Sequence, residues 1–409
     1  MTISRKVSAV FIAGMILGLK VSEAAEWSAS PSFRLLGDYD SNMFLTTQQH
    51  DSQTSTAVSP KLDLGISSSI WQLTGGAELT RRYYPGRSDL DSDARYYKLG
   101  SLYRTERSVW QLNATSSSTF YLVDRETSTD VGLFSVNTRT DSKSISPSWT
   151  WLMTELTQLQ LAYTQSDVSY VGDQGNGLYH DYRSSAMSLN LTTHLDMYTQ
   201  VFLSPVYSVF RVPATTFESK TTSYQVGITR TFSATMNGTL SVGERNTSSE
   251  NEILVCKLSL GPLCLQTAQE TMSSRDSSSI FSANLDKQFE TVHLTAVVSR
   301  SFAPSAIGEQ VRTDLVSFSL SKPFTATLTG NLATYGYRIS SETGGVAGAD
   351  DRRLYQIAPS LRWQWAPEWN LDTGYRYTHL QRVSETTAAT SNAAYLTLAY
   401  QWPKISISR

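Results

Sequence analysis

The sequence lacks any apolar run long enough to form a membrane-spanning helix beyond its first residues. A helix needs roughly 20 apolar residues to cross a bilayer, and after residue 24 the chain never approaches that length. Its mean hydropathy is -0.26. A helical membrane protein is therefore excluded, and any membrane crossing must be made by strands.

Charge is also scarce. Charged residues make up 17% of the chain, the formal net charge is -2, and the pI is near 6.2. Such a chain offers no general attraction for nucleic acid. We expect no nucleic-acid partner.

Only two cysteines are present, Cys256 and Cys264, in one polar segment. In an oxidising compartment they could close a small loop disulfide. A metal site is the alternative, but neither a histidine nor a third cysteine lies near. The spacing favours the loop disulfide.

Catalytic motifs are missing as well. His180 and Asp181, with Ser184 and Ser185 nearby, resemble part of a hydrolase site, but no G-x-S-x-G elbow surrounds them. The five histidines are scattered and never take metal-ligand spacing. We expect no enzyme and no cofactor, and a barrel-embedded hydrolase is the weakest alternative.

One acidic run superficially suggests calcium. Asp89, Asp91 and Asp93 match the start of a calcium loop, yet Ala94 stands where the loop needs Gly and Gly100 where it needs Glu. A solvated acidic loop without a metal is the better interpretation.

The N-terminus has the pattern of an export signal. Two basic residues precede an apolar run over 7–19, and small residues at Ser22 and Ala24 fit a signal-peptidase site. A short membrane anchor is the alternative, but so few apolar residues cannot span a bilayer. We predict a signal peptide over 1–24 and one barrel domain over 25–409.

From residue 26 onward, apolar and polar residues alternate with a period of two. Because successive side chains of a strand point to opposite faces, each strand has one apolar and one wet face. Short connections alternate with longer polar ones, such as 42–55, 213–218 and 246–277. This layout predicts an all-β fold: a single transmembrane antiparallel up-and-down β-barrel of about 18 strands, with short periplasmic turns and long external loops.

The two faces of the strands predict two sets of residues. Trp71, Trp110 and Trp369 each open a strand just after a short turn, as an aromatic girdle at the membrane interface requires, although a soluble β-protein core could also place them there. Tyrosines near the loop bases could stack on sugar rings or belong to the girdle. The polar parity predicts these lumen-lining residues: Gln72, Glu78, Gln111, Asn113, Gln158, Gln160, Asp372 and Arg376.

Both ends of the predicted barrel resemble a known family. The first strand ends in Tyr39-Asp40-Ser-Asn42-Met-Phe44, and the chain closes on Tyr400-Gln-Trp402-Pro-Lys-Ile-Ser-Ile-Ser-Arg409. These ends resemble the β-barrel porins found with exopolysaccharide and exosortase systems. The resemblance implies an outer-membrane barrel that takes part in exopolysaccharide production or passage, and it carries over no catalytic residue.

The expected function is therefore porin-like transport in the bacterial outer membrane, of exopolysaccharide or of small hydrophilic, sugar-like solutes. Its expected partners are outer-membrane lipid, the barrel-assembly machinery and the transported polysaccharide or solute. A structural or adhesive barrel without an open pore remains the alternative. Many barrels finish on a terminal Phe, whereas this chain ends in Arg409, so we expect the assembly machinery to use an internal signal.

Overall fold

The computed structural model describes residues 25–48, 51–120, 138–171, 180–260, 263–304, 310–341, 351–383 and 385–408. The predicted signal peptide, 1–24, lies outside these residues. The described part holds nineteen strands and one short 3-10 helix, η1 (Ser88–Leu90). The strands are β1 (Glu26–Asp40), β2 (Gln53–Ser67), β3 (Trp71–Tyr83), β4 (Ser92–Arg104), β5 (Ser108–Phe120), β6 (Arg139–Leu152), β7 (Thr157–Val171), β8 (Tyr182–His194), β9 (Thr199–Val212), β10 (Phe217–Ser233), β11 (Met236–Leu260), β12 (Leu263–Gln288), β13 (His293–Pro304), β14 (Gln310–Pro323), β15 (Leu328–Ser341), β16 (Arg352–Ala366), β17 (Trp369–Arg382), β18 (Ala389–Gln401) and β19 (Ile405–Ser408).

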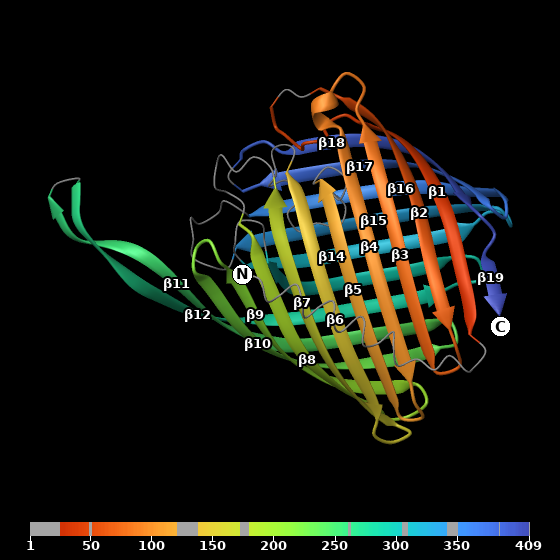
Figure 1. Cartoon of the computed structure of the whole chain (residues 1–409), viewed down its shortest axis with the longest axis horizontal. Helices are drawn as coiled ribbons and strands as arrows, with labels where there is room; N and C mark the ends of the chain where they lie inside the picture. Colours follow the sequence, from red (N-terminus) through yellow and green to blue (C-terminus); the bar gives the residue numbers. More distant parts are fainter. Residues whose placement is uncertain are drawn as a thin grey trace.

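The sheet closes on itself. Each strand from β1 to β18 pairs antiparallel with its neighbours in sequence, and β1 pairs with β2 on one edge and with β18 and then β19 on the other. β19 continues the edge of β18 after a short break that contains Pro403, which has no N–H to donate to a ladder. The result is a closed 18-stranded up-and-down barrel, and that prediction is confirmed (Figure 1).

The connections differ between the two ends of the barrel. At the end where β1 begins and β19 ends, neighbouring strands are joined by two to four residues, for example 234–235 and 324–327. The other end carries the connections over 121–138, 172–181 and 342–351, which lie largely outside the described residues. We call these the short-turn end and the long-connection end.

Two predicted long loops at the long-connection end are wrong. Residues 213–216 form a turn of four residues, and 246–277 belong mostly to β11 and β12. These strands stay paired as far as Leu260 and Leu263, so they leave the barrel as a twisted ribbon (Figure 1). Pairing between β12 and β13 stops at Phe281 opposite Arg300. Polar Ser, Thr, Asn and Glu residues hid this ribbon in the sequence, because a strand outside a core needs no apolar face.

Aromatic and aliphatic side chains cover the outward face. Leu64, Val226, Leu240 and Val316 are each at least 45% exposed. All nine tryptophans of the chain lie on this face at the short-turn end, at Trp27, Trp71, Trp110, Trp149, Trp151, Trp363, Trp365, Trp369 and Trp402. Several of the rings touch, with centroids 5.7 Å apart for Trp365 and Trp369. The predicted positions of Trp71, Trp110 and Trp369 thus fall in one belt.

Candidate functional site

Ion pairs that skip a strand identify the inward face of the barrel. Arg34 on β1 bonds Glu78 on β3 at 2.8 Å, and Lys98 on β4 lies 2.8 Å from Asp63 on β2. Side chains from alternate strands of a curved sheet meet only on its concave side. The second bridge passes over Gly76, where an added Cβ would lie 2.7 Å from a carboxylate oxygen of Asp63. A larger residue at that position would push the bridge aside.

The ladder carries this assignment around the barrel to all eight residues predicted to line the lumen. Gln72, Glu78 and Arg82 lie on the same face of β3. Gln72 pairs with Leu102 on β4, which pairs in turn with Gln111 on β5, so Gln111 also faces inward. Arg376 lies opposite Ala393, which pairs with Asp40 on β1. The register places the remaining ones, Asn113, Gln158, Gln160 and Asp372, on the same face.

A third of the inward face, six of the eighteen strands, is uncharged in its described residues. On β5 to β10, no Asp, Glu, Lys or Arg among the described residues points inward. We call this surface the hydroxyl wall. Its side chains include Gln111, Asn113, Thr115, Ser142, Ser144, Ser146, Ser148, Gln158, Gln160, Thr164, Ser184, Ser188, Asn190, Ser204, Ser208, Ser219, Thr221, Ser223 and Gln225. These groups both donate and accept hydrogen bonds, so the wall can bind polar solutes without a net field.

Seven further strands line the interior with charge. On β16 to β18 and β1 to β4, the inward residues include Arg352, Arg362, Asp372, Arg376, Arg382, Arg34, Asp38, Asp40, Lys61, Asp63, Glu78, Arg82 and Lys98. We call this surface the charged wall. Most of its carboxylates have a cationic partner close by: Arg362 bonds Asp372 at 2.7 Å, and Lys61 lies 2.9 Å from Asp63. These carboxylates are therefore paired locally, while the cationic side chains named with them outnumber them by eight to five.

The connection after β1 folds into the mouth of the barrel at the long-connection end. We call residues 41–46 the mouth segment. Asn42 is 1% exposed, and its Nδ2 donates to the carbonyl oxygens of Thr46 at 2.9 Å and Thr390 at 3.0 Å. Its Oδ1 accepts from the Thr46 N–H at 3.1 Å. Asn42 therefore closes the turn on itself and fastens it to β18.

Leu45 anchors the same segment through apolar contacts. It has a φ of 50°, which a non-glycine residue rarely adopts. Its side chain is 1% exposed and packs with Leu354, Leu380 and Ala389 on β16 to β18. Burial of this side chain holds the unfavourable backbone conformation in place.

A second buried cluster continues from the mouth segment to the opposite side. Met43 belongs to a cluster with Tyr84 and Leu90 from the connection after β3, and with Val168 and Tyr170 on β7. In an 18-stranded ring, β7 lies nine strands from β16 and so faces it across the barrel. A continuous line of contacts therefore crosses the mouth from the β16–β18 side to β7.

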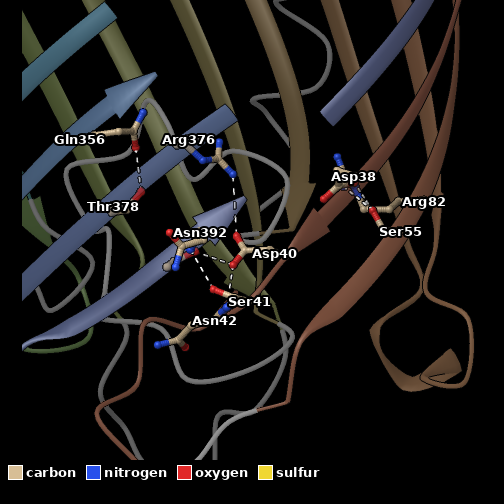
Figure 2. Close-up of polar contacts among 11 residues, drawn as sticks. Asp38, Asp40, Ser41, Asn42, Ser55, Arg82, Gln356, Arg376, Thr378 and Asn392 are labelled. Carbon is tan, nitrogen blue, oxygen red and sulfur yellow. Dashed lines mark hydrogen bonds and ion pairs between the residues drawn. The ribbon is translucent and has the colours of Figure 1, made fainter. Parts of the chain in front are cut away.

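Charged groups fasten the base of the mouth segment, as Figure 2 shows. Asp40 is 4% exposed, accepts from the Ser391 hydroxyl at 2.5 Å, and lies 3.9 Å from the Arg376 guanidinium. Beside it, Arg82 donates to Asp38 at 2.7 Å and to Ser55 at 2.6 Å. These bonds tie β1 to β2, β3, β17 and β18 where the segment begins.

The sequence pattern that carries the family resemblance also marks this site. The Tyr-Asp-x-Asn-x-Phe pattern that carries the family resemblance contains Asp40, Asn42 and Phe44, which are the residues of the mouth. Arg82 and Leu45 were missed, because nothing local in the sequence shows that a residue 44 positions away will pair with Asp38.

The residues weighed for catalysis and calcium are held apart. Asp181 accepts from the Tyr170 N–H at 2.8 Å, and Ser184 and Ser185 point to opposite faces of β8. Asp89 bonds Arg87, whereas Asp93 bonds Arg81. In the described ranges, no three His, Cys, Asp or Glu side chains gather in a way that could hold a metal ion.

The cysteines lie on the ribbon, where only the backbone is described. The register sets Cys256 opposite Thr267 and Cys264 opposite Ser259. Their side chains lie outside the described part of the chain, so the disulfide stays a prediction.

Comparison with known proteins places the chain in no family. No helix among the described residues is long and apolar enough to cross a membrane. No family model and no curated protein matches the chain. Among solved structures it is similar to OccAB2 from Acinetobacter baumannii, with a TM-score of 0.48, 10% identity, and coverage of 92% of this chain and 98% of that one. It is also similar to OccK5 (OpdH) from Pseudomonas aeruginosa, with a TM-score of 0.46, 10% identity, and coverage of 92% and 98%. The alcaligin outer-membrane receptor FauA from Bordetella pertussis matches with a TM-score of 0.44, 10% identity, and coverage of 90% and 76%. At these identities and TM-scores the similarities assign no substrate to this chain.

Proposed function

We propose that this protein is a channel of the bacterial outer membrane that passes uncharged hydrophilic solutes of the saccharide class. A closed barrel can cross a bilayer because every strand edge is paired. The exposed apolar side chains and the tryptophan belt of the outward face supply the surface that lipid and its interface require.

The hydroxyl wall is the observation that carries the choice of solute. Six neighbouring strands present inward hydroxyl and amide groups and no ionic side chain in their described residues. Such a surface exchanges hydrogen bonds with sugar hydroxyls as water does, and it neither attracts nor repels ions strongly.

We further propose that the solute is connected with exopolysaccharide production or passage. The support is the resemblance of the two chain ends to barrel porins of such systems, together with a lumen suited to neutral sugar units. An unbranched polymer would move along the hydroxyl wall by exchanging a hydrogen bond with one hydroxyl group for a bond with the next, at a small cost in free energy.

A structural or adhesive barrel without an open pore is the second candidate. The contacts across the mouth favour it, because Met43 and Leu45 join opposite sides of the barrel through buried clusters. The two candidates differ in one respect: a channel must open this mouth, whereas a structural barrel need not.

The test is passage through the folded protein. We expect conductance steps in planar bilayers, swelling of proteoliposomes in neutral oligosaccharides, and slower swelling in charged sugars of equal size. Asn113→Leu, on the hydroxyl wall, should slow the entry of neutral sugar, whereas Ala114→Leu, its outward-facing neighbour, should not. Absence of both conductance and swelling would refute the channel and favour the structural barrel. Unchanged polymer secretion in a deletion strain would refute the exopolysaccharide role alone.

A further inference from the structure

A band of charged residues lies on the outward face near the long-connection end of β6 to β10. Arg183 on β8 and Arg211 on β9 stand directly opposite each other in the ladder. Like charges in that position repel. An anionic ligand bound between the two guanidinium groups would relieve this repulsion.

The carboxylates beside this pair orient it without neutralising the patch. Arg183 bonds Asp167, and Arg211 bonds Glu218 at 2.6 Å. The guanidinium side chains remain 58% and 55% exposed. Each arginine is held in a fixed direction and still has donors free for a second acceptor.

The surface here is hollowed. A cavity of about 720 Å³ lies over these strands. Five basic and three acidic residues line it, Arg95, Arg139, Lys143, Arg183, Arg211, Asp141, Asp167 and Asp181. Hydroxyl groups of Ser116, Ser118 and Ser169 lie between them. A basic hollow with interleaved hydroxyls suits a phosphorylated sugar, because arginine binds phosphate with two bonds while serine binds sugar hydroxyls.

Apolar residues continue the same rows toward the short-turn end. Ile145 follows Lys143 on β6, Met187 follows Arg183 on β8 after one serine, and Tyr207 precedes Arg211 on β9. Their exposed fractions are 44%, 57% and 47%. The hollow therefore lies at the boundary between apolar and charged surface, where a lipid's acyl chains end and its headgroup begins.

We propose that this hollow binds the phosphorylated headgroup of a glycolipid in the outer leaflet, with its acyl chains along the apolar rows below. The inference rests on the proposed outer-membrane location but not on passage through the lumen. The Arg183 and Arg211 pair binds phosphate, and the serines and Asp141 bind the sugar.

The experiment measures binding of purified lipid A to the detergent-folded protein by native mass spectrometry. We expect bisphosphorylated lipid A to bind at least about tenfold more tightly than its dephosphorylated form, because charge-assisted bonds are lost. The R183Q/R211Q variant should lose the same factor, and R183K/R211K should recover part of it. A heat-dependent shift of the band on a gel confirms that each variant folds.

A matched control separates a site from general attraction. Arg338 and Arg353 also oppose each other, across β15 and β16, on the outward face. R338Q/R353Q removes the same charge from the same end of the barrel and should bind lipid A as the wild type does. Equal loss in both double variants, or equal binding of dephosphorylated lipid, would overturn the proposal. Conductance of R183Q/R211Q should equal that of the wild type, so failure of the lipid site and failure of the channel give different results.

Discussion

The hydroxyl wall and the charged wall belong to one sheet and follow the same alternation of inward and outward side chains, yet their inward side chains have different roles. Among the described residues, the polar bonds from the mouth segment to the barrel reach the side of the charged wall, where Ser41 bonds Asn392, Asn42 bonds Thr390 and the Leu45 carbonyl accepts from Arg382. On the far side, within the described part of the chain, the segment packs into the apolar cluster that contains Val168 and Tyr170. The charged wall thus holds the mouth, and the hydroxyl wall is left free for solute.

The difference also teaches how a lumen tolerates charge. Carboxylates on the charged wall occur beside a guanidinium or ammonium group, as in the Asp63 pair with Lys61 and Lys98. Hydroxyls need no such arrangement, because each can turn its proton toward whichever acceptor is near. Opening of the mouth should require release of both attachments, the polar one of Asn42 to β18 and the apolar one of Met43 to β7, with the end of β1 as the hinge.

The strongest test of this comparison is Asn42→Ala. The variant loses three side-chain hydrogen bonds within and beneath the mouth segment. At about 1 kcal/mol each, the ratio of open to closed mouth should rise about 100-fold. Single-channel recordings should show long open periods in place of brief ones. Asn113→Ala makes the same change on the hydroxyl wall and should leave the open times as they are; equal open times in Asn42→Ala and the wild type would contradict the role of the mouth segment.

The strand architecture was predictable from the sequence, and the mouth was not. Alternation along each strand and the short turns give the closed ring, because both are local properties. Leu45 contacts Leu354 and Leu380, which come more than 300 residues later in the chain. These contacts depend on how the connection after β1 folds into the lumen. Alternation also predicted the faces of Gln111 and Asn113, but it could not tell that β5 to β10 would form one uncharged surface.

The next test concerns stability within the charged wall. Arg82→Ala leaves Asp38 without its cation in a pair whose side chains are only 11% and 22% exposed. We expect the free energy of unfolding in urea to fall by about 2 kcal/mol. Arg34→Ala removes an arginine that is 52% exposed, so its cost should stay below about 1 kcal/mol. Equal losses would show that burial does not distinguish the two pairs.

Ion selectivity compares the two walls directly. Asp63→Asn leaves Lys61 and Lys98 without their carboxylate, so the channel should shift toward anions. Asn113→Asp adds a carboxylate to a wall that has no cation to pair with it, and should shift the channel toward cations. Reversal potentials in a salt gradient should move by on the order of 10 mV in opposite directions. A shift in Asp63→Asn alone would place the solute path along the charged wall.

The smallest effect should be a pH dependence at the mouth. Burial raises the pKa of the Tyr84 phenol above its ordinary value, which is about 10. The closed mouth favours the neutral phenol, so its stability is complete below about pH 10 and declines as the pH rises toward the raised pKa. Open times should therefore be constant to about pH 10 and lengthen above it. Tyr84→Phe should abolish the change, whereas Tyr103→Phe, at a tyrosine that is 46% exposed, should keep it. If Tyr84→Phe retains the alkaline opening, the titrating group lies elsewhere, and the contact between the mouth segment and the β7 side is not what holds the mouth closed.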